Sequence, residues 1–405
     1  MKLPPVLVLG VDTPVGLTIV RELGRHGVSV HGIGNSRDAL ARTSRYLDGF
    51  SLRPQGPPLS EWLPERIFHT GVRALFAIAE DDLVALAALP EDIEGCRILT
   101  PRKAQLDLVL DKNRTLALAA GLGIDAPESW QPIADEDFAR YAETLTYPVV
   151  AKWADPPAMT RILAKHGLEL IKAEHAATPG ALLALLDRYA PIREWPMVQP
   201  YCPGYGLGQS FHMAWGKASL SFQHRRIHEW PPQGGISTLC ESLPLDRHAH
   251  QRAKSEALLA AIGWNGPAMV EYRHDPETGK YWLMEVNGRF WGSQPLALHC
   301  GVEFAWEQYR HAMLRESDAA TPRFLERRAR FMVPETRRLL AILSPGNPFP
   351  NYSRARAAEL FAYVGGFFDP RMRYFVHSRD DPRPMLQEVG GIIHRFLRRE
   401  KRPED

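Results

Sequence analysis

The segment 281–290 limits the fold of this chain more than any other. It reads Tyr-Trp-Leu-Met-Glu-Val-Asn-Gly-Arg-Phe, so a mostly apolar run is followed by a carboxylate, a carboxamide and a guanidinium at alternate positions. Because successive side chains of a strand point to opposite faces, Glu285, Asn287 and Arg289 would share one face. The segment therefore predicts a strand that ends in a polar cluster.

A second carboxylate is predicted to join this cluster. Glu271 lies in the largely apolar segment 267–272, and residues 275–279 read Asp-Pro-Glu-Thr-Gly, the composition of a hairpin turn. Two antiparallel strands would bring Glu271 beside Glu285 and Asn287. Hard oxygen ligands of this kind suit Mg²⁺, which is usually held by one or two carboxylates. The alternative is a solvated hairpin face that carries an Arg–Glu ion pair.

Length and composition are those of an ordinary globular protein. With 405 residues the chain is long enough for two or three domains, and 45% hydrophobic and 24% charged residues exclude a disordered or fibrous chain. The net charge of +2 predicts no strongly charged partner. No apolar run reaches the roughly 20 residues of a membrane-spanning helix, and we expect a cytoplasmic location.

The cysteines and histidines predict no metal centre. Four cysteines are widely spaced and form no Cys-x-x-Cys, so neither a disulfide framework nor a zinc site is expected from Cys96, Cys202, Cys240 and Cys300. His224 and His228 lie close in sequence but have no third ligand nearby. Buried or incidental side chains are the simpler interpretation.

The first hundred residues indicate a strand–helix–strand unit of the doubly wound kind. Apolar residues 6–9 and 28–32 enclose a helical stretch that follows the turn 10–16. The glycines of the turn do not form Gly-x-Gly-x-x-Gly, so we predict no nicotinamide site. A further apolar run, 74–79, ends at the acidic residues 80–82. These charges would lie where sites form in parallel sheets, or they would cap the helix that follows.

After residue 100 the pattern of the sequence changes twice. Residues 100–120 have a helical pattern, and 148–290 alternate strands with helices and hairpins in an α+β order. Beyond about residue 322 arginine becomes frequent and helical periodicity dominates. The basic, amphipathic segment 392–399 would suit an anionic lipid or nucleic acid, but a packed terminal helix is the preferred interpretation. We therefore expect no nucleic acid partner and no stable membrane insertion.

Several of these residues, taken in order, resemble the ATP-grasp superfamily of ATP-dependent carboxylate ligases. The matching positions are Lys112, Lys152, the strand end 199–202, Glu271 and the segment 285–289. The resemblance covers about residues 4–315, and the part beyond 320 is similar to the extension of a subgroup of predicted carboligases. It implies a mixed α/β and α+β chain with a Rossmann-like pre-ATP-grasp domain at 1–100, an ATP-grasp domain at 101–320 and a helical, Arg-rich extension at 321–405.

The resemblance also implies roles for individual residues. The positions that would contact ATP are Lys112 and Lys152 at the phosphates, Gln199, Tyr201 and Cys202 at the adenine, and Gln209 at the ribose. The positions that would hold one or two Mg²⁺ ions, with Mn²⁺ as an alternative, are Glu271, Glu285 and Asn287. Arg289 would face the transferring phosphoryl group or the acceptor carboxylate.

Two further segments, 222–238 and the loop after Lys152, are expected to contact the substrate or the phosphates. In the segment 222–238, Arg226 would bind a substrate carboxylate and the glycines at 234 and 235 would present N–H groups to an acyl phosphate; the alternative is a solvated hairpin. The loop after Lys152 departs from the glycine-rich pattern of many ATP-grasp enzymes, because two prolines stiffen it. Arg161 or Lys172 would then replace backbone amides at the phosphates.

The expected activity is that of a ligase. A small-molecule carboxylate would be activated by ATP as an acyl phosphate and captured by an amine. Two alternatives stay open: a bicarbonate-phosphorylating carboxylase or carbamoyl-phosphate-type enzyme, and an ATP-binding regulatory protein without turnover. Assembly as a homodimer is also left open.

Overall fold

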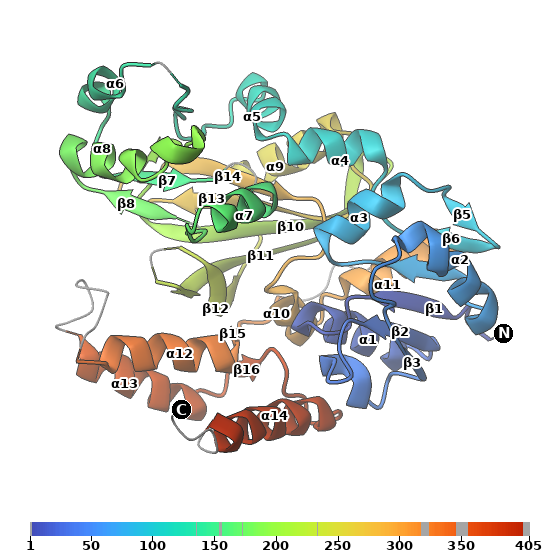
Figure 1. Cartoon of the computed structure of the whole chain (residues 1–405). Helices are drawn as coiled ribbons and strands as arrows, with labels where there is room; N and C mark the ends of the chain where they lie inside the picture. Colours follow the sequence, from blue (N-terminus) through green and yellow to red (C-terminus); the bar gives the residue numbers. More distant parts are fainter. Residues whose placement is uncertain are drawn as a thin grey trace.

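The computed structural model of the chain describes residues 2–134, 136–153, 156–171, 173–232, 234–316, 324–345 and 355–399. Its strands form three sheets (Figure 1): a six-stranded sheet near the N-terminus, a small three-stranded sheet in the upper lobe, and a seven-stranded central sheet. None of the described helices is both long and apolar enough to cross a membrane.

The N-terminal sheet has the strand order β3-β2-β1-β4-β6-β5 and is parallel except for β5. Its elements are β1 (Val6–Leu9), α1 (Pro14–Arg25), β2 (Val30–Gly34), η1 (Leu40–Thr43), β3 (Gly49–Leu52), α2 (Leu59–Thr70), β4 (Ala74–Phe76), α3 (Glu80–Ala87), β5 (Asp92–Ile93) and β6 (Cys96–Ile98). Thr13 caps α1 by accepting a hydrogen bond from the Gly16 N–H at 3.1 Å. A Cβ at Gly16 would lie 2.5 Å from the Gly10 carbonyl oxygen, so only glycine lets this helix pack on the turn. The predicted strand–helix–strand unit is present.

The expected helix at 100–120 is two helices, α4 (Lys103–Leu110) and α5 (Lys112–Gly121). The break has a local cause: Asp111 is extended and its carboxylate accepts a hydrogen bond from the Arg114 N–H at 3.1 Å, which starts a new helix. As a result, Lys112 lies at the first position of α5 rather than on a helix side.

The upper lobe follows α5. Its elements are α6 (Phe138–Thr144), β7 (Val149–Lys152), α7 (Pro156–Lys165), β8 (Glu174–Ala176), α8 (Pro179–Asp187), η2 (Ala190–Ile192) and β9 (Met197–Pro200). The three strands are antiparallel in the order β8-β7-β9. They have a core of their own that includes Val149, Leu182 and Val198.

The central sheet has the order β14-β13-β10-β11-β12-β15-β16. Its first five strands and the helices among them are β10 (Tyr205–Ala214), β11 (Lys217–Trp230), β12 (Ile236–Leu243), α9 (Ala249–Ala261), β13 (Gly266–His274), β14 (Tyr281–Asn287), α10 (Gln294–His299), α11 (Phe304–Tyr309) and the π-turn η3 (Arg310–Leu314). The predicted hairpin of β13 and β14 forms one end of this sheet.

The C-terminal extension is not only helical, which corrects the prediction from sequence. Its elements are β15 (Arg328–Arg330), α12 (Met332–Leu343), α13 (Arg356–Gly365), η5 (Gly366–Phe368), β16 (Met372–Tyr374) and α14 (Arg383–Arg399). β15 pairs antiparallel with β12, and β16 pairs parallel with β15. Each strand has three residues, too few for a visible alternation, and forms only because β12 offers a sheet edge to pair with.

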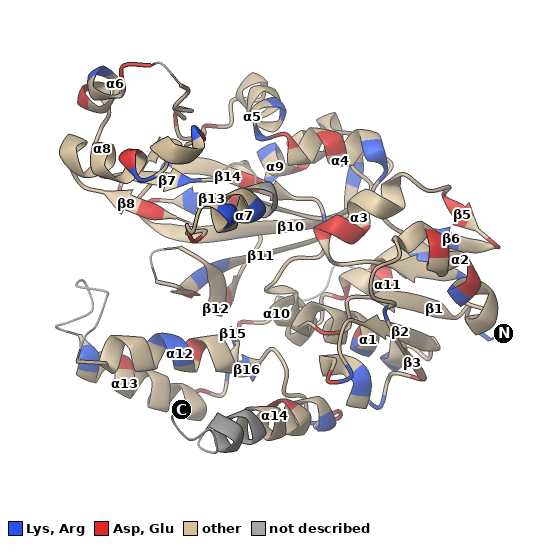
Figure 2. Cartoon of the chain, in the orientation of Figure 1, with Lys and Arg blue, Asp and Glu red and all other residues tan. Residues whose placement is uncertain are grey.

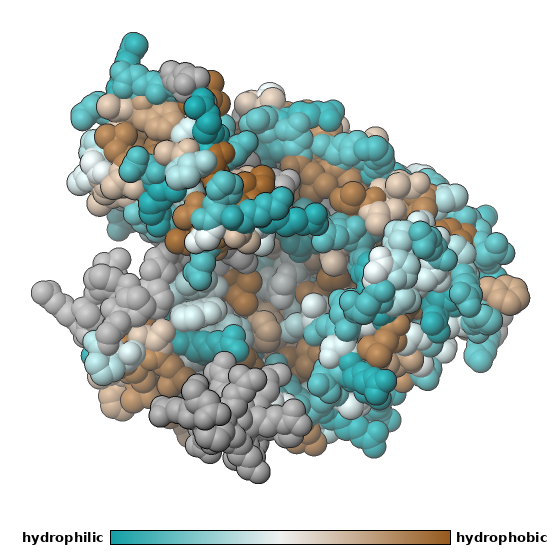
Figure 3. Space-filling model, viewed as in Figure 1, coloured by the Kyte–Doolittle hydropathy of each residue, from teal (hydrophilic) through white to brown (hydrophobic). Residues whose placement is uncertain are grey.

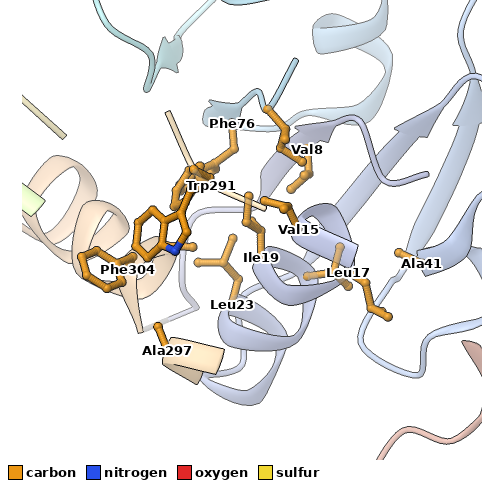
Figure 4. Close-up of a cluster of buried hydrophobic side chains, with 14 of the residues drawn as sticks. Val8, Val15, Leu17, Ile19, Leu23, Ala41, Phe76, Trp291, Ala297 and Phe304 are labelled. Carbon is orange, nitrogen blue, oxygen red and sulfur yellow. The ribbon is translucent and has the colours of Figure 1, made fainter. Parts of the chain in front are cut away.

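Apolar side chains from distant segments form a shared core. Val8, Ile19 and Phe76 of the N-terminal part belong to the same buried cluster as Trp291 and Phe304, and Figure 4 shows these side chains gathered around α1. This cluster crosses the boundary expected near residue 100. The boundaries at 100 and 320 therefore stay predictions.

Two buried carboxylates, Glu22 and Asp381, add polar contacts between the N-terminal part and the rest of the chain. Glu22 on α1 accepts hydrogen bonds from the Ala305 N–H at 2.6 Å and the Trp306 N–H at 3.3 Å, at the start of α11. Asp381 binds Arg21 at 2.9 Å and the Ser44 hydroxyl at 2.7 Å. The first contact joins the N-terminal part to the central region, and the second joins it to the C-terminal extension.

Glu22→Gln tests the first contact through pH. Burial raises the pKa of Glu22 from 4.5 to about 8, and the nearby Glu303 carboxylate adds to this rise. Between these values the folded chain holds a proton that the unfolded chain has released, so the free energy of unfolding should fall as the pH rises, by at most about 1.4 kcal/mol per pH unit. The free energy of unfolding, measured in urea near pH 5 and near pH 8, should fall less between these two pH values in the variant than in wild type. An unchanged slope would contradict the buried, protonated state of Glu22.

Asp381→Ala tests the second contact. The change leaves the guanidinium of Arg21 buried without its carboxylate, which should lower the free energy of unfolding by about 3–5 kcal/mol. The matched control is Asp380→Ala, since Asp380 pairs with Arg25 at the surface and should cost about 1 kcal/mol. Thermal or urea unfolding measures both. Equal losses in the two variants would contradict the special role of Asp381.

Candidate active site

The turn between β13 and β14 sets the register of the two acidic strands. Asp275 accepts hydrogen bonds from the Glu277 N–H at 3.0 Å and the Thr278 hydroxyl at 2.7 Å, and Gly279 has a φ of +71° that glycine adopts without strain. In this register Glu271 lies directly opposite Glu285. The predicted pairing of the two carboxylates is present.

The two carboxylates have different surroundings. Glu285 is exposed and accepts a hydrogen bond from the Asn287 carboxamide at 2.9 Å. Glu271 is only 9% exposed and binds the Arg226 guanidinium at 2.5 Å. Burial raises the pKa of Glu271 to about 7 against the lowering effect of Arg226, and Glu285 contributes to the rise. A divalent cation placed between the two carboxylates would remove their mutual repulsion.

Arg226 is held among acidic groups. Besides Glu271, its guanidinium lies 3.7 Å from the Glu229 carboxylate and donates to the Gly235 carbonyl at 3.4 Å. Burial lowers the pKa of Arg226, but Glu271, Glu229 and Glu285 outweigh burial and raise it. A side chain paired in this way holds Glu271 in place, and the substrate role expected from the sequence stays a prediction.

Lys152 feels the charges of the same two carboxylates and of a second lysine, Lys112. Burial lowers the pKa of Lys152, the ammonium group of Lys112 lowers it further, and the charges of Glu285 and Glu271 oppose this shift. Lys152 of β7 is therefore within electrostatic reach of Glu285, Glu271 and the ammonium group of Lys112. Figure 2 marks basic and acidic positions along the ribbons around β7, β13 and β14.

The strand end 199–202 lies in the upper lobe. Gln199 is 7% exposed, pairs with Val150 across the strands, and donates a hydrogen bond to the Ser129 hydroxyl at 2.8 Å. Its amide oxygen is therefore the atom that can accept a bond from a ligand. Tyr201 donates its N–H to the Pro148 carbonyl at 2.9 Å, and burial raises the pKa of the Cys202 thiol.

A cavity of about 210 Å³ adjoins this strand end. Its walls are Asp111, Lys112, Asn113, Ser129, Gln131 and Met197. It thus connects the start of α5, which carries Lys112, with Ser129, the partner of Gln199. Figure 3 shows the surface hollowed between the upper lobe and the elements below it.

Gln209 does not belong to this site, which corrects the prediction from sequence. Its register partner is Val270, so it faces away from Glu271, whose partner on β10 is Gly208. Its carboxamide is fully buried, donating to Gln223 at 3.1 Å and accepting from the Ser255 hydroxyl at 2.8 Å. The resemblance assigned Gln209 to the ribose, but its side chain lies on the other face of β10.

Arg289 lies just beyond the end of β14, toward the N-terminal sheet. Its guanidinium is 4.0 Å from the Glu80 carboxylate and donates to the Phe290 carbonyl at 3.1 Å. Close to it is a cavity of about 370 Å³ at the carboxyl end of the N-terminal strands. The cavity is lined by Gly10, Asp12, Thr13, Asn35, Arg53, Ile78, Ala79, Asp81 and Asp82.

No family model and no curated protein matches this sequence. Solved structures do match. The biotin carboxylase domain of Hydrogenobacter thermophilus 2-oxoglutarate carboxylase, in complex with MgADP, ADP and bicarbonate, has a TM-score of 0.60 at 14% identity over 80% of this chain and 73% of that one. N5-carboxyaminoimidazole synthetase from Staphylococcus aureus, complexed with ADP, has a TM-score of 0.60 at 13% identity over 81% and 82%. L-amino acid ligase from Bacillus licheniformis has a TM-score of 0.55 at 15% identity over 77% and 75%.

The chain has the ATP-grasp fold. The resemblance found in the sequence is thereby confirmed at the level of the fold. Within this fold Glu271 and Glu285 lie opposite each other and Lys152 is within electrostatic reach of both, while the roles of the predicted site residues stay predictions. At these identities the likeness shows the fold and not the activity or substrate of this chain.

The sequence did not reveal three polar residues of the site. Ser129 lies in a loop and gives no pattern of its own. Glu229 reaches Arg226 because bulges shift the register of β11 against β12 next to it, which no strand periodicity predicts. Arg273, 4.0 Å from Glu229, follows Glu271 by two residues, and the strand period would have placed it on the same side.

Part of the loop after Lys152 lies outside the described residues. The residues concerned are 154 and 155, and Lys172 further along the chain is outside as well. Arg161 is exposed on α7, so whether it reaches the phosphates stays a prediction.

Gln209→Leu separates a core role from a ligand role. Loss of the carboxamide leaves Gln223 and Ser255 with unmet hydrogen bonds in the core, so the free energy of unfolding should fall by about 1–3 kcal/mol. Affinity for MgADP, measured by calorimetry on the folded variant, should stay within about twofold of wild type, a difference of about 0.4 kcal/mol. A large loss of affinity with unchanged stability would return Gln209 to the ligand site.

Proposed function

We propose that the chain is an ATP- and Mg²⁺-dependent ligase that activates a carboxylate for capture by an amine. The single observation that supports this proposal is the opposed pair Glu271 and Glu285, with Lys152 within electrostatic reach of both carboxylates and of Lys112. Two acidic groups together with two ammonium groups suit a metal-bound polyphosphate, because each phosphate oxygen and the metal then has a partner of opposite charge.

The residues fit a bound Mg²⁺ ion by their donor chemistry. Glu271, Glu285 and the amide oxygen of Asn287 are hard oxygen donors on neighbouring strands, and the carboxylates repel each other without a cation between them. When bound, Mg²⁺ would offset the negative charge that develops on the phosphate oxygens. Arg226 holds Glu271 in its orientation through their ion pair.

The remaining nucleotide contacts follow from the strand end. Gln199, positioned by Ser129, would accept a hydrogen bond from the adenine amino group, and the backbone at Tyr201 and Cys202 would complete the recognition. Lys112 and Lys152 would neutralise the phosphates. For catalysis, the charges of these two lysines would matter more than a general base. A carboxylate that attacks phosphorus needs stabilisation of negative charge and not removal of a proton.

The acceptor side would begin at Arg289. Its guanidinium points from the end of β14 toward Glu80, beside the cavity that Asp12, Asp81 and Asp82 help to line. We propose that Arg289 contacts the acceptor carboxylate or its acyl phosphate and that the amine enters from the acidic cavity. The acyl phosphate must be kept from water, and a site between two lobes can provide this by closing.

A second candidate is the phosphorylation of bicarbonate. A specific observation favours it: one structure with the same fold is a biotin carboxylase domain bound to bicarbonate. Release of ADP from MgATP distinguishes the candidates when organic acids, amines and bicarbonate are supplied singly and in pairs. A requirement for an organic acid supports the ligase, bicarbonate alone supports the alternative, and failure to bind MgATP contradicts both.

Glu285→Gln tests the metal site. The change keeps size and removes one charge that would ligate Mg²⁺, so ADP formation should fall by at least about 100-fold, or about 2.7 kcal/mol of transition-state stabilisation. The matched control is Glu277→Gln, an exposed residue of the same hairpin, which should keep its activity within about twofold. Full activity of Glu285→Gln would remove Glu285 from the site.

A further inference from the structure

A second cluster of potential metal ligands lies away from the nucleotide site. Among the described residues, one ligand atom each of His212, Glu307 and His311 lies within 4.8 Å of the other two. Glu307 Oε1 and His311 Nε2 are 3.2 Å apart, and the two rings of His212 and His311 have centroids 5.1 Å apart. A distance near 3.3 Å is what two donors bound to one tetrahedral ion would show, at bond lengths of about 2.0–2.1 Å.

Secondary structure brings the three side chains together. Glu307 is in α11 and His311 in the π-turn η3 that continues it, so their spacing of four residues puts them on one side of this helical segment. His212 comes from β10, next to the irregularity between His212 and Met213. π-turns often occur at functional sites, because they move one side chain out of the regular helical position.

The hydrogen bonds of His212 leave the right nitrogen for a metal. The Ser219 hydroxyl is within 3.3 Å of the His212 carbonyl oxygen, to which it donates, so at 2.8 Å it accepts from Nδ1–H of the ring. The lone pair of the neutral ring is then on Nε2. A second partner that fixes the tautomer in this way is usual for metal-ligating histidines.

Two of the three ligand atoms have unmet bonding capacity. Glu307 is 3% exposed, and neither its Oε1 nor Nε2 of His311 makes a hydrogen bond of good geometry, although the two buried atoms lie 3.2 Å apart. The other carboxylate oxygen of Glu307 lies 3.3 Å from the Arg310 guanidinium. Burying polar atoms without partners costs about 1–3 kcal/mol each, a cost that a bound cation would remove.

We propose that His212, Glu307 and His311 bind a divalent transition-metal ion of the Zn²⁺ class. Two imidazoles and one carboxylate form a donor set that suits zinc and that Mg²⁺ does not favour. Such an ion would tie β10 of the central sheet to α11, the helix whose start is bound by Glu22 of the N-terminal part. Its role would be structural.

The site is separate from the proposed Mg²⁺ ligands. His212 lies four residues along β10 from Gly208, the register partner of Glu271, which is about 13 Å at the usual rise of a strand. The inference therefore does not depend on the proposed ligase activity, and either can fail alone.

The test uses the full chain, stripped of metal with a chelator and kept in excess Mg²⁺ so that the nucleotide site does not compete. Titration with Zn²⁺ should show one tight equivalent and a raised unfolding temperature, and Co²⁺ should give the visible absorption of a tetrahedral nitrogen–oxygen site. In His311→Gln and His212→Gln the affinity should fall by at least about tenfold. His250→Gln, which removes an exposed histidine of α9, is the matched control and should bind as wild type does.

A further measurement distinguishes a variant that folds poorly from one that has only lost a metal ligand. The unfolding temperature of each metal-free variant is compared with that of metal-free wild type, and Glu307→Gln replaces any histidine variant that does not fold. Zn²⁺ that binds wild type no more tightly than the variants, or that leaves the unfolding temperature unchanged, overturns the proposal. MgATP binding measured in parallel reports on the nucleotide site independently.

Discussion

The opposition of two carboxylates across hydrogen-bonded strands is the constraint on which the candidate site depends. Like charges placed directly opposite each other in a sheet are destabilising, and burial of Glu271 increases the cost. The chain offsets this cost with cations from two other elements: Arg226 from β11 and Lys152 from β7. Because these cations come from both the central sheet and the upper lobe, the acidic pair interacts electrostatically with both.

The rest of the structure keeps these elements in place. Phe76 and Trp291 pack in one core, so the N-terminal sheet and the region after β14 are held together by apolar contacts. Asp381 brings the C-terminal extension against Arg21 of α1, and β15 adds the same extension to the edge of β12. Arg289, two residues beyond the end of β14, lies 4.0 Å from Glu80 of the N-terminal part.

Sequence reasoning succeeded where the signal was local and failed where it was not. The alternation in 281–290 and the turn chemistry at Asp275 predicted the hairpin and the pairing of Glu271 with Glu285, because both depend on neighbouring residues. Gln209 was assigned to the ribose by the resemblance, and its face depends on the register of β10 with β13, which lies outside the local pattern. The short strand β15 escaped notice because a three-residue strand has almost no periodicity.

The sequence by itself determined the kind of fold and the residue types of the site, since strand alternation, turn residues and helix caps act over a few positions. Tertiary structure alone decided which charges meet. It paired Arg226 with Glu271, a contact that the sequence did not predict, and it brought His212 within reach of Glu307 and His311. Such contacts join residues far apart in sequence, and their geometry depends on packing that no local pattern encodes.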